Sequence, residues 1–173
     1  RLRRAPAAET RLDGMTVVIS PDFNPVPSLE HTTNVVLGSA ADLDAASARA
    51  CFLSVEGDLP SCECVSGLTR DELATAGFTG KSGQTLRKPG ETLVVFVGAG
   101  NEPFTAATLR DAVANFTRAA SEAATLAIDL EGVIAAGLSA REAALAATEG
   151  AILARYRFEP LKREEKNMQL ETL

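Results

Sequence analysis

Three cysteines, Cys51, Cys62 and Cys64, are the first residues whose type and spacing suggest chemistry. The Cys62-Glu63-Cys64 spacing points to metal binding, because thiolates bind zinc and other soft metal ions. A structural zinc site usually needs four ligands, commonly as paired Cys-x-x-Cys elements, and His31 is the only histidine. An odd, small number of cysteines is no disulfide framework. We therefore expect reduced thiols that fill space, and no metal site in this chain.

A glycine-rich turn at 98–101, directly before a predicted helix, is the second candidate site. Helix N-termini attract anions, so Gly98, Gly100 and Asn101 form a candidate anion or ligand loop. The turn is neither a P-loop nor a dinucleotide fingerprint, because Phe104 stands where the third glycine would be. A tight strand-to-helix connection without a ligand is the alternative interpretation.

Three basic residues, Lys81, Arg87 and Lys88, lie in the turn-rich segment GFTGKSGQTLRKPGE and predict a basic surface. Together with arginines at the start of the chain, they make DNA binding an alternative. The net charge of −6 and the pI of about 4.9 oppose it. An acidic chain repels phosphate backbones at long range.

No other pattern indicates catalysis. The GxSxG motif of hydrolases does not occur in the sequence. His31 is a lone histidine in a loop, where solvation is its usual state. Glu149 lies in an Ala-rich helical segment, where we expect it to act as a cap or to pair with Arg155 rather than to work as a functional carboxylate.

The candidate ligand loop needs a strand and a helix to position it. The apolar run 93–97 does not alternate, which is typical of a strand buried on both faces, and we place this strand at 92–98. A helix from about 106 to 124 follows, with apolar residues at spacings of four and three. These residues are Leu109, Val113, Phe116, Ala120 and Ala123. Strand, turn and helix predict the crossover of an α/β fold.

Other elements are predicted on both sides of this crossover. The remaining predicted strands are 15–20, 34–40 (buried) and 126–130. A short helix or turn covers 42–50, and Asp42 is its candidate cap. Residues 51–66 stay open, with 51–55 as a candidate strand.

Two further helices begin with capping boxes, Thr69-Arg70-Asp71-Glu72 and Ser139-Ala140-Arg141-Glu142. The first box predicts a helix over 70–76, which Gly77 ends while Phe78 packs back on Leu73. The second begins the final helix, which Pro160 ends. Glycine inside a helix costs roughly 1 kcal/mol against alanine, so Gly150 predicts a close contact.

Length and composition fit one soluble globular domain. The chain has 173 residues, of which 46% are hydrophobic and 23% charged. Aromatics make up 5% and tryptophan is absent, so the core must consist of Ala, Val, Leu and Phe. No apolar run is long enough to span a bilayer, and the basic N-terminus lacks the apolar segment of a signal peptide. We expect a cytoplasmic protein without a membrane partner.

Two segments resemble the N-terminal domain of the leucyl (cytosol) aminopeptidase family. One is AGFTGKSGQTLRKPGETLVVFVGAGN at 76–101, followed by the helix with Thr105, Leu109 and Arg110. The other is EGAILARYRF at 149–158, which resembles the last helix of that domain and its exit toward the linker. Residues 1–66 match only loosely, and Ala99 stands where the family would have leucine.

The resemblance implies a three-layer α/β/α, macrodomain-like fold: a mixed sheet with helices on both faces. It divides the chain into a disordered or loosely packed lead-in (1–14), the domain itself (15–160) and the start of a linker (161–173). The linker would lead to a catalytic domain that is absent from this chain.

Members of that family are metallo-aminopeptidases that remove N-terminal residues from peptides. Their C-terminal domain holds two divalent ions, zinc or manganese, through Asp, Glu and Lys side chains, and no residue here matches its Asn-Thr-Asp-Ala-Glu-Gly-Arg stretch. The resemblance therefore implies no catalytic residue in this chain, a structural, oligomer-shaping or regulatory role, and a homohexamer of the whole protein. The main alternative is a stand-alone macrodomain-like module that binds ADP-ribose or a related nucleotide at 98–101. DNA binding, which occurs in some bacterial relatives, is a further alternative.

Overall fold

The structure is a computed structural model that describes residues 10–12, 15–17, 32–156 and 169–173. The predicted lead-in, the strand at 15–20 and the predicted linker lie partly outside these ranges, and His31 and Pro160 lie wholly outside them. The helices and strands are β1 (Thr10–Leu12), β2 (Met15–Val17), α1 (Ala40–Ala45), β3 (Ala48–Ser54), the single turn η2 (Glu63–Val65), α2 (Arg70–Thr75), β4 (Thr85–Lys88), β5 (Leu93–Gly100), α3 (Ala106–Ala119), β6 (Leu126–Ala127), α4 (Glu131–Ala135) and α5 (Ala140–Arg155).

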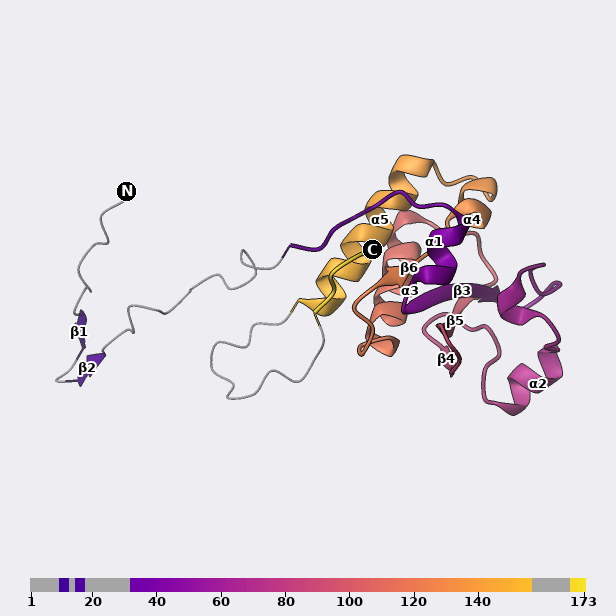
Figure 1. Cartoon of the computed structure of the whole chain (residues 1–173), viewed down its shortest axis with the longest axis horizontal. Helices are drawn as coiled ribbons and strands as arrows, with labels where there is room; N and C mark the ends of the chain where they lie inside the picture. Colours follow the sequence, from indigo (N-terminus) through magenta and orange to yellow (C-terminus); the bar gives the residue numbers. More distant parts are fainter. Residues whose placement is uncertain (1–9, 13–14, 18–31, 157–168) are drawn as a thin grey trace.

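A four-stranded mixed sheet lies at the centre of the domain, in the order β4-β5-β3-β6 (Figure 1). β3 pairs in parallel with β5 and β6, whereas β4 runs antiparallel to β5. The register places Ala50 beside Val95 and Cys51 beside Phe96. β1 and β2 form a separate antiparallel pair. The predicted α/β fold with a mixed sheet is confirmed.

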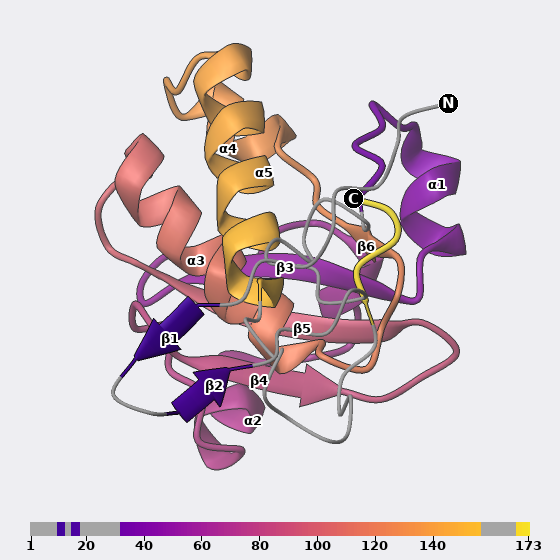
Figure 2. The same ribbon diagram turned by 90° about the vertical axis from the view of Figure 1, so that its left-hand side faces the viewer.

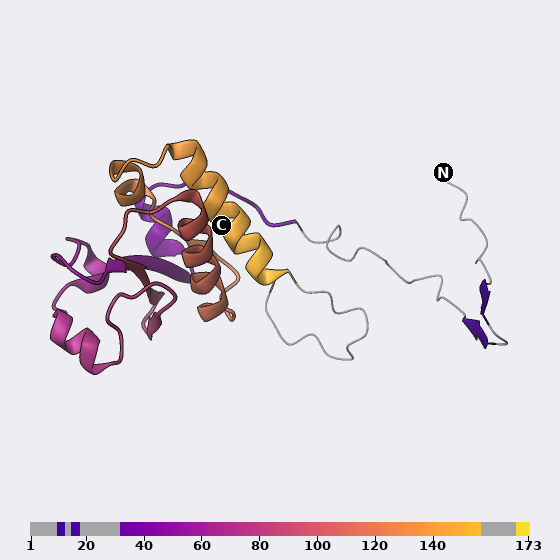
Figure 3. The same cartoon turned by 180° about the vertical axis from the view of Figure 1, so that it is seen from behind.

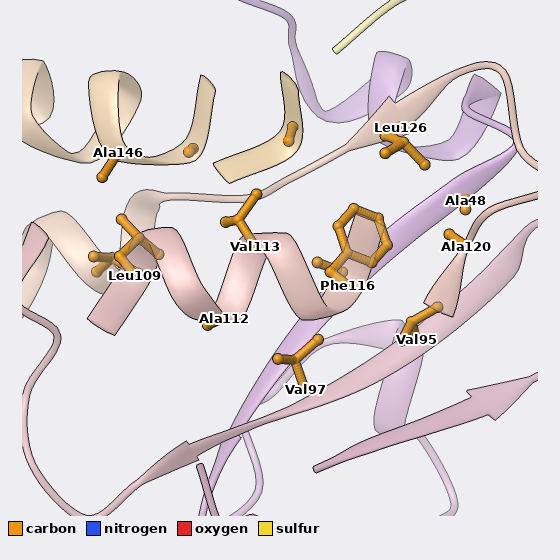
Figure 4. Close-up of a cluster of buried hydrophobic side chains, with 14 of the residues drawn as sticks. Ala48, Val95, Val97, Leu109, Ala112, Val113, Phe116, Ala120, Leu126 and Ala146 are labelled. Carbon is orange, nitrogen blue, oxygen red and sulfur yellow. The ribbon is translucent and has the colours of Figure 1, made fainter. Parts of the chain in front are cut away.

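Successive side chains of a strand point to opposite sides of the sheet. Those of the central strands β3 and β5 are buried in two separate cores, one on each face. Val95 and Val97 belong to the larger core, and Figure 4 shows them facing α3 near Phe116. Val94 and Phe96 belong to a smaller core on the other face, which α2 and η2 cover. Double-sided burial explains why the run 93–97 is apolar without alternation.

α3 and α5 pack side by side over the larger core (Figure 3). The whole predicted apolar stripe of the α3 segment is buried, although α3 ends at Ala119 rather than at 124. The residues of α5 that face α3 are small: Ala143, Ala146, Ala147, Gly150 and Ala151 are all buried. A Cβ at Gly150 would lie 2.5 Å from the carbonyl oxygen of Arg110, so the predicted close contact at Gly150 is confirmed. In the described part of the chain, no helix is long and apolar enough to cross a membrane.

The capping signals specify the ends of the helices as predicted. Both capping boxes are present, Thr69 with Glu72 before α2 and Ser139 with Glu142 before α5. Gly77 follows α2 with a φ of 85°, a value that glycine adopts without a Cβ clash. The amide of Phe78 then donates to the carbonyl of Leu73 at 2.9 Å, and both side chains join the smaller core.

The predicted buried strand at 34–40 is wrong. Asn34 forms only an isolated bridge with Thr172, and the next three side chains are exposed, up to 95% at Leu37. The backbone of this segment pairs with residues 171–173. No layer of the described structure covers its apolar side chains, so they stay at the surface despite their β propensity.

The predicted helix at 42–50 is also displaced. Ser39 rather than Asp42 is the N-cap of α1, and the Asp42 carboxylate accepts from the Ser39 amide at 2.6 Å. This contact lowers the pKa of Asp42. β3 already begins at Ala48, so the candidate strand 51–55 is the second half of a longer strand.

The last five residues lie along β6, where Figure 2 shows the C-terminus. The amide of Glu171 donates to Ala124 at 2.9 Å, and that of Leu126 donates to Thr172 at 3.0 Å. Leu170 is buried in the larger core. β6 itself is two residues long, shorter than the strand predicted at 126–130.

Candidate functional site

The three cysteines meet on the sheet face opposite to α3 and α5. Cys51 comes from β3, Cys62 directly precedes η2, and Cys64 lies within η2. Their Sγ atoms all lie within 4.8 Å of one another, and those of Cys51 and Cys62 are 3.9 Å apart. Cys51 and Cys64 are buried, whereas Cys62 is exposed. Among the described residues, this thiol cluster is the only group of three or more His, Cys, Asp or Glu side chains placed to share a metal ion.

The chain reaches this arrangement because the segment between β3 and α2 folds back over the sheet. Arg70, the first residue of α2, donates to the carbonyl of Gly57 at 2.7 Å and to that of Ser54 at 2.8 Å. Val65 of η2 is buried in the smaller core. The Lys88 ammonium donates to the carbonyl of Cys64 at 3.2 Å. The sequence signal was the Cys-x-Cys spacing, but nothing in the sequence shows that this segment returns to Cys51.

Two of the thiols share a hydrogen bond that drives their pKa values apart. The bond from Cys51 lowers the pKa of Cys64 to about 6, and the positive charge of Arg49 adds to this effect while burial opposes it. The same bond raises the pKa of Cys51, and burial raises it further. Of these two thiols, Cys64 therefore gives up its proton more readily than Cys51.

Arg49 provides a positive charge beside the cluster. It precedes Cys51 by two residues on β3, so both side chains point to the same face of the sheet. Its Nη1 lies 2.8 Å from the Asp44 carboxylate and its Nη2 lies 4.0 Å from that of Glu63. Its Nε is buried and has no hydrogen-bond partner in the described part of the chain. A buried cationic donor without a partner favours an anionic group nearby.

The candidate ligand loop is built differently from the sequence prediction. Gly98 lies inside β5, which continues to Gly100, so the turn begins later than expected. The amides of Gly98 and Gly100 donate at 2.9 Å to the carbonyls of Gln84 and Gly80. Asn101 is exposed just beyond the strand. Ligand binding here stays a prediction, and two of its backbone donors already have protein partners.

The three predicted basic residues have different surroundings. Lys81 is exposed in the turn before β4. Arg87 forms an ion pair with Glu122 at 2.6 Å, which raises the pKa of Arg87 and lowers that of Glu122. Lys88 points to the other side of β4, toward Cys64. The basic surface and the DNA-binding alternative both stay predictions.

Glu149 pairs with Arg110 of α3, at 2.7 Å, whereas the sequence predicted a cap or a pair with Arg155. Arg155, in the last turn of α5, instead binds backbone carbonyls at the end of α3. Those carbonyls belong to Thr117, Ala120, Ser121 and Ala123. The sequence could not indicate which turns of the two helices lie side by side.

The mixed sheet with helices on both faces defines the protein as an α/β domain. The sequence profile for the N-terminal domain of the cytosol aminopeptidase family matches residues 61–165. The chain belongs to this family.

Solved structures support the assignment. The bottromycin maturation enzyme BotP is 28% identical to this chain with a TM-score of 0.57, and the alignment covers 74% of this chain and 27% of BotP. The structure of BotP in complex with Mn is 29% identical to this chain, with a TM-score of 0.57. The alignment covers 74% of this chain and 26% of the BotP chain. A mutant of tomato leucine aminopeptidase shares the fold at 18% identity, with a TM-score of 0.62. The alignment covers 82% of this chain and 31% of the tomato enzyme. The comparison with curated proteins found no match.

The residues described here do not fit the two-metal site of Asp, Glu and Lys side chains that the family implies. Their one metal-capable cluster consists of three cysteine thiols. Thiolates prefer soft ions, whereas carboxylates suit Mn²⁺ and other hard ions. No step of peptide hydrolysis can therefore be derived from these residues.

Proposed function

We propose that this chain is the non-catalytic N-terminal domain of a larger, cytoplasmic two-metal aminopeptidase, which releases N-terminal amino acids from peptides. The family match over residues 61–165 carries this proposal. The chain spans 27% of BotP and 31% of the tomato enzyme, which leaves ample length in such proteins for a separate catalytic domain. That domain would hold the two divalent ions, zinc or manganese.

The role proposed for the domain is to shape the assembly, a homohexamer in the full-length protein, and to dock on the catalytic domain. Support comes from one side of α5, where large apolar side chains are exposed. Leu145, Ile152, Leu153 and Tyr156 are 56%, 40%, 65% and 53% exposed. The spacing of the first three places them along one stripe of the helix, and Tyr156 is the C-cap directly after it. Exposed apolar stripes of this kind are typical of contact surfaces.

Activity measurements test the catalytic part of the proposal. The purified chain and the longer protein from the same coding sequence are each assayed with a chromogenic leucine substrate in the presence of Mn²⁺ or Zn²⁺. We expect metal-dependent release of leucine from the longer protein alone. Metal-dependent release by the chain alone, well above the blank, would show that the domain is catalytic.

A charged substitution on the exposed side of α5 tests the proposed role in assembly. Leu153→Asp in the longer protein should change its oligomeric state, measured by light scattering, because it places a charge in the apolar stripe. Leu37→Asp is the matched control, since Leu37 is 95% exposed on another segment. An unchanged assembly for both variants would contradict a contact through α5.

A further inference from the structure

The thiol cluster has no part in the proposed function, yet its geometry is specific. Three Sγ atoms from two separate segments converge within 4.8 Å. Two of the cysteines are buried, and the third, Cys62, reaches the surface. A set of ligands that converges at the protein surface gives a metal ion both donors and an access route.

The distances decide between a metal site and a disulfide. With metal–sulfur bonds of about 2.3 Å, two sulfurs on one ion lie about 3.8 Å apart in a tetrahedral site and about 4.0 Å apart in a trigonal one. Cys51 and Cys62 already stand at 3.9 Å. A disulfide needs about 2.05 Å between its two sulfurs, so Cys51 and Cys62 would have to move closer together, and the third thiol would be left without a role. The arrangement therefore fits one shared ion better than a pair of bonded sulfurs.

The charges around the cluster also favour a metal-thiolate complex. Three thiolates and one divalent ion carry a net charge of −1, which needs a nearby cation in a partly buried site. Arg49 is on the same strand face and its side chain is only 16% exposed. Its Nη1 pairs with Asp44, whereas its buried Nε lacks a hydrogen-bond partner among the described residues. Lys88, the last residue of β4, donates to the carbonyl of Cys64 at 3.2 Å.

We propose that Cys51, Cys62 and Cys64 bind one thiophilic metal ion of the Zn²⁺ or Cu⁺ class through three thiolates. The described residues supply no fourth ligand, so a Zn²⁺ ion would complete its tetrahedron with a solvent molecule, whereas Cu⁺ would be trigonal. Binding releases the thiol protons to solvent and ties η2 to β3. This site is independent of the two-metal centre proposed for the catalytic domain.

Metal titration of the chain itself provides the test. The chain is prepared with reductant, without oxygen, and freed of metal with a chelator. Zn²⁺, Cu⁺ and Mn²⁺ are then added separately, and Co²⁺ serves as a spectroscopic probe for the zinc site. We expect one equivalent of Zn²⁺ or Cu⁺ to bind, sulfur-to-cobalt charge-transfer bands with Co²⁺, and no tight binding of Mn²⁺. Saturating metal should raise the Tm by about 5 °C or more.

The variant Cys62→Ser removes one ligand at the surface, where a serine leaves the fold unchanged. Changes to residues around a metal ligand lower metal affinity by roughly 10–100-fold, and loss of a ligand itself should lower it further. Cys62→Ser should also abolish the charge-transfer bands. Ser61→Ala, at the exposed neighbouring position, is the matched control and should bind as the parent does. Circular dichroism verifies that both variants are folded.

Cu⁺ binding at one equivalent without Zn²⁺ binding would support the site and assign it to copper. Three results would overturn the proposal: no stoichiometric binding of either ion, equal affinity in Cys62→Ser, or Mn²⁺ binding as tightly as Zn²⁺. None of these results bears on the aminopeptidase proposal, because they concern a site in this domain alone and are read from spectra rather than from peptide hydrolysis.

Discussion

Gly150→Ala should destabilise the domain, although alanine is the better helix former. Two effects oppose each other at this position. Alanine gains roughly 1 kcal/mol over glycine inside a helix. Against this, its Cβ would lie 2.5 Å from the carbonyl oxygen of Arg110 and 3.2 Å from the Cβ of Val113, whereas ordinary contacts begin at 3.4 Å. The nearest atom is backbone, so it cannot rotate away as a flexible side chain would.

The two helices must therefore separate by roughly 0.9 Å at their closest point. A gap of this size forfeits about a quarter to a half of the dispersion energy of each contact it opens. Overpacking of this kind costs about 1–3 kcal/mol, and we place this case near the upper end because α3 and α5 contact each other along their buried faces. After the gain in helix propensity, the net loss is about 2 kcal/mol, or about 4–8 °C in Tm for a chain of this size.

Urea unfolding followed by far-UV circular dichroism measures this loss. Gly132→Ala is the matched control, because Gly132 is also helical but has nothing within 4 Å of the added Cβ. It should leave stability unchanged or raise it by up to about 1 kcal/mol. If Gly150→Ala unfolded at the same or a higher urea midpoint than the parent, the close packing of α3 on α5 would be refuted.

Three further predictions concern a helix cap, a partly buried guanidinium and a thiolate. Thr105→Ala removes the side chain that caps α3 and should lower the free energy of unfolding by about 1 kcal/mol in the same urea assay. Arg155→Met leaves carbonyls at the end of α3 without their charged donor and should cost about 2–4 kcal/mol. The pKa of Cys64 is lowered to about 6, so thiolate absorbance of the reduced, metal-free chain should appear as the pH rises through that value. Arg49→Gln should move this step to higher pH, because it removes a positive charge that favours the thiolate.

Each of these predictions has a control variant or a result that would contradict it. Arg155→Lys keeps the charge but not the planar fork of donors, so it should restore only part of the lost stability. Full restoration would mean that charge alone matters. A thiolate step that stays in place in Arg49→Gln would remove Arg49 as a cause, and the Cys64→Ser variant identifies which absorbance belongs to Cys64. A Thr105→Ala chain as stable as the parent would show that the cap of α3 contributes nothing measurable.

Local signals in the sequence were sufficient for α2, α5 and the buried stripe of α3, but they missed α4 and displaced α1. These signals are the two predicted capping boxes, the glycine after α2 and the apolar stripe of α3. Each depends only on residues close together in the chain, so it can be recognised in the sequence. The continuous apolar run of β5 likewise predicted a strand with two buried faces. The same rule failed at 34–40, since an apolar run shows only that burial would be favourable, and Leu37 is left exposed because no layer among the described residues covers it.

The sequence by itself determined the α/β class, the capped helices and, through the resemblance at 76–101 and 149–158, the family. Only the tertiary structure decided the long-range contacts. It paired Glu149 with Arg110, because the packing of α5 on α3 fixes which turns meet. It also brought Cys51 to the pair at 62 and 64, because the segment after β3 folds back over the sheet. Contacts between distant residues depend on how the elements pack, and local propensities, which act over a few residues, carry no information about that.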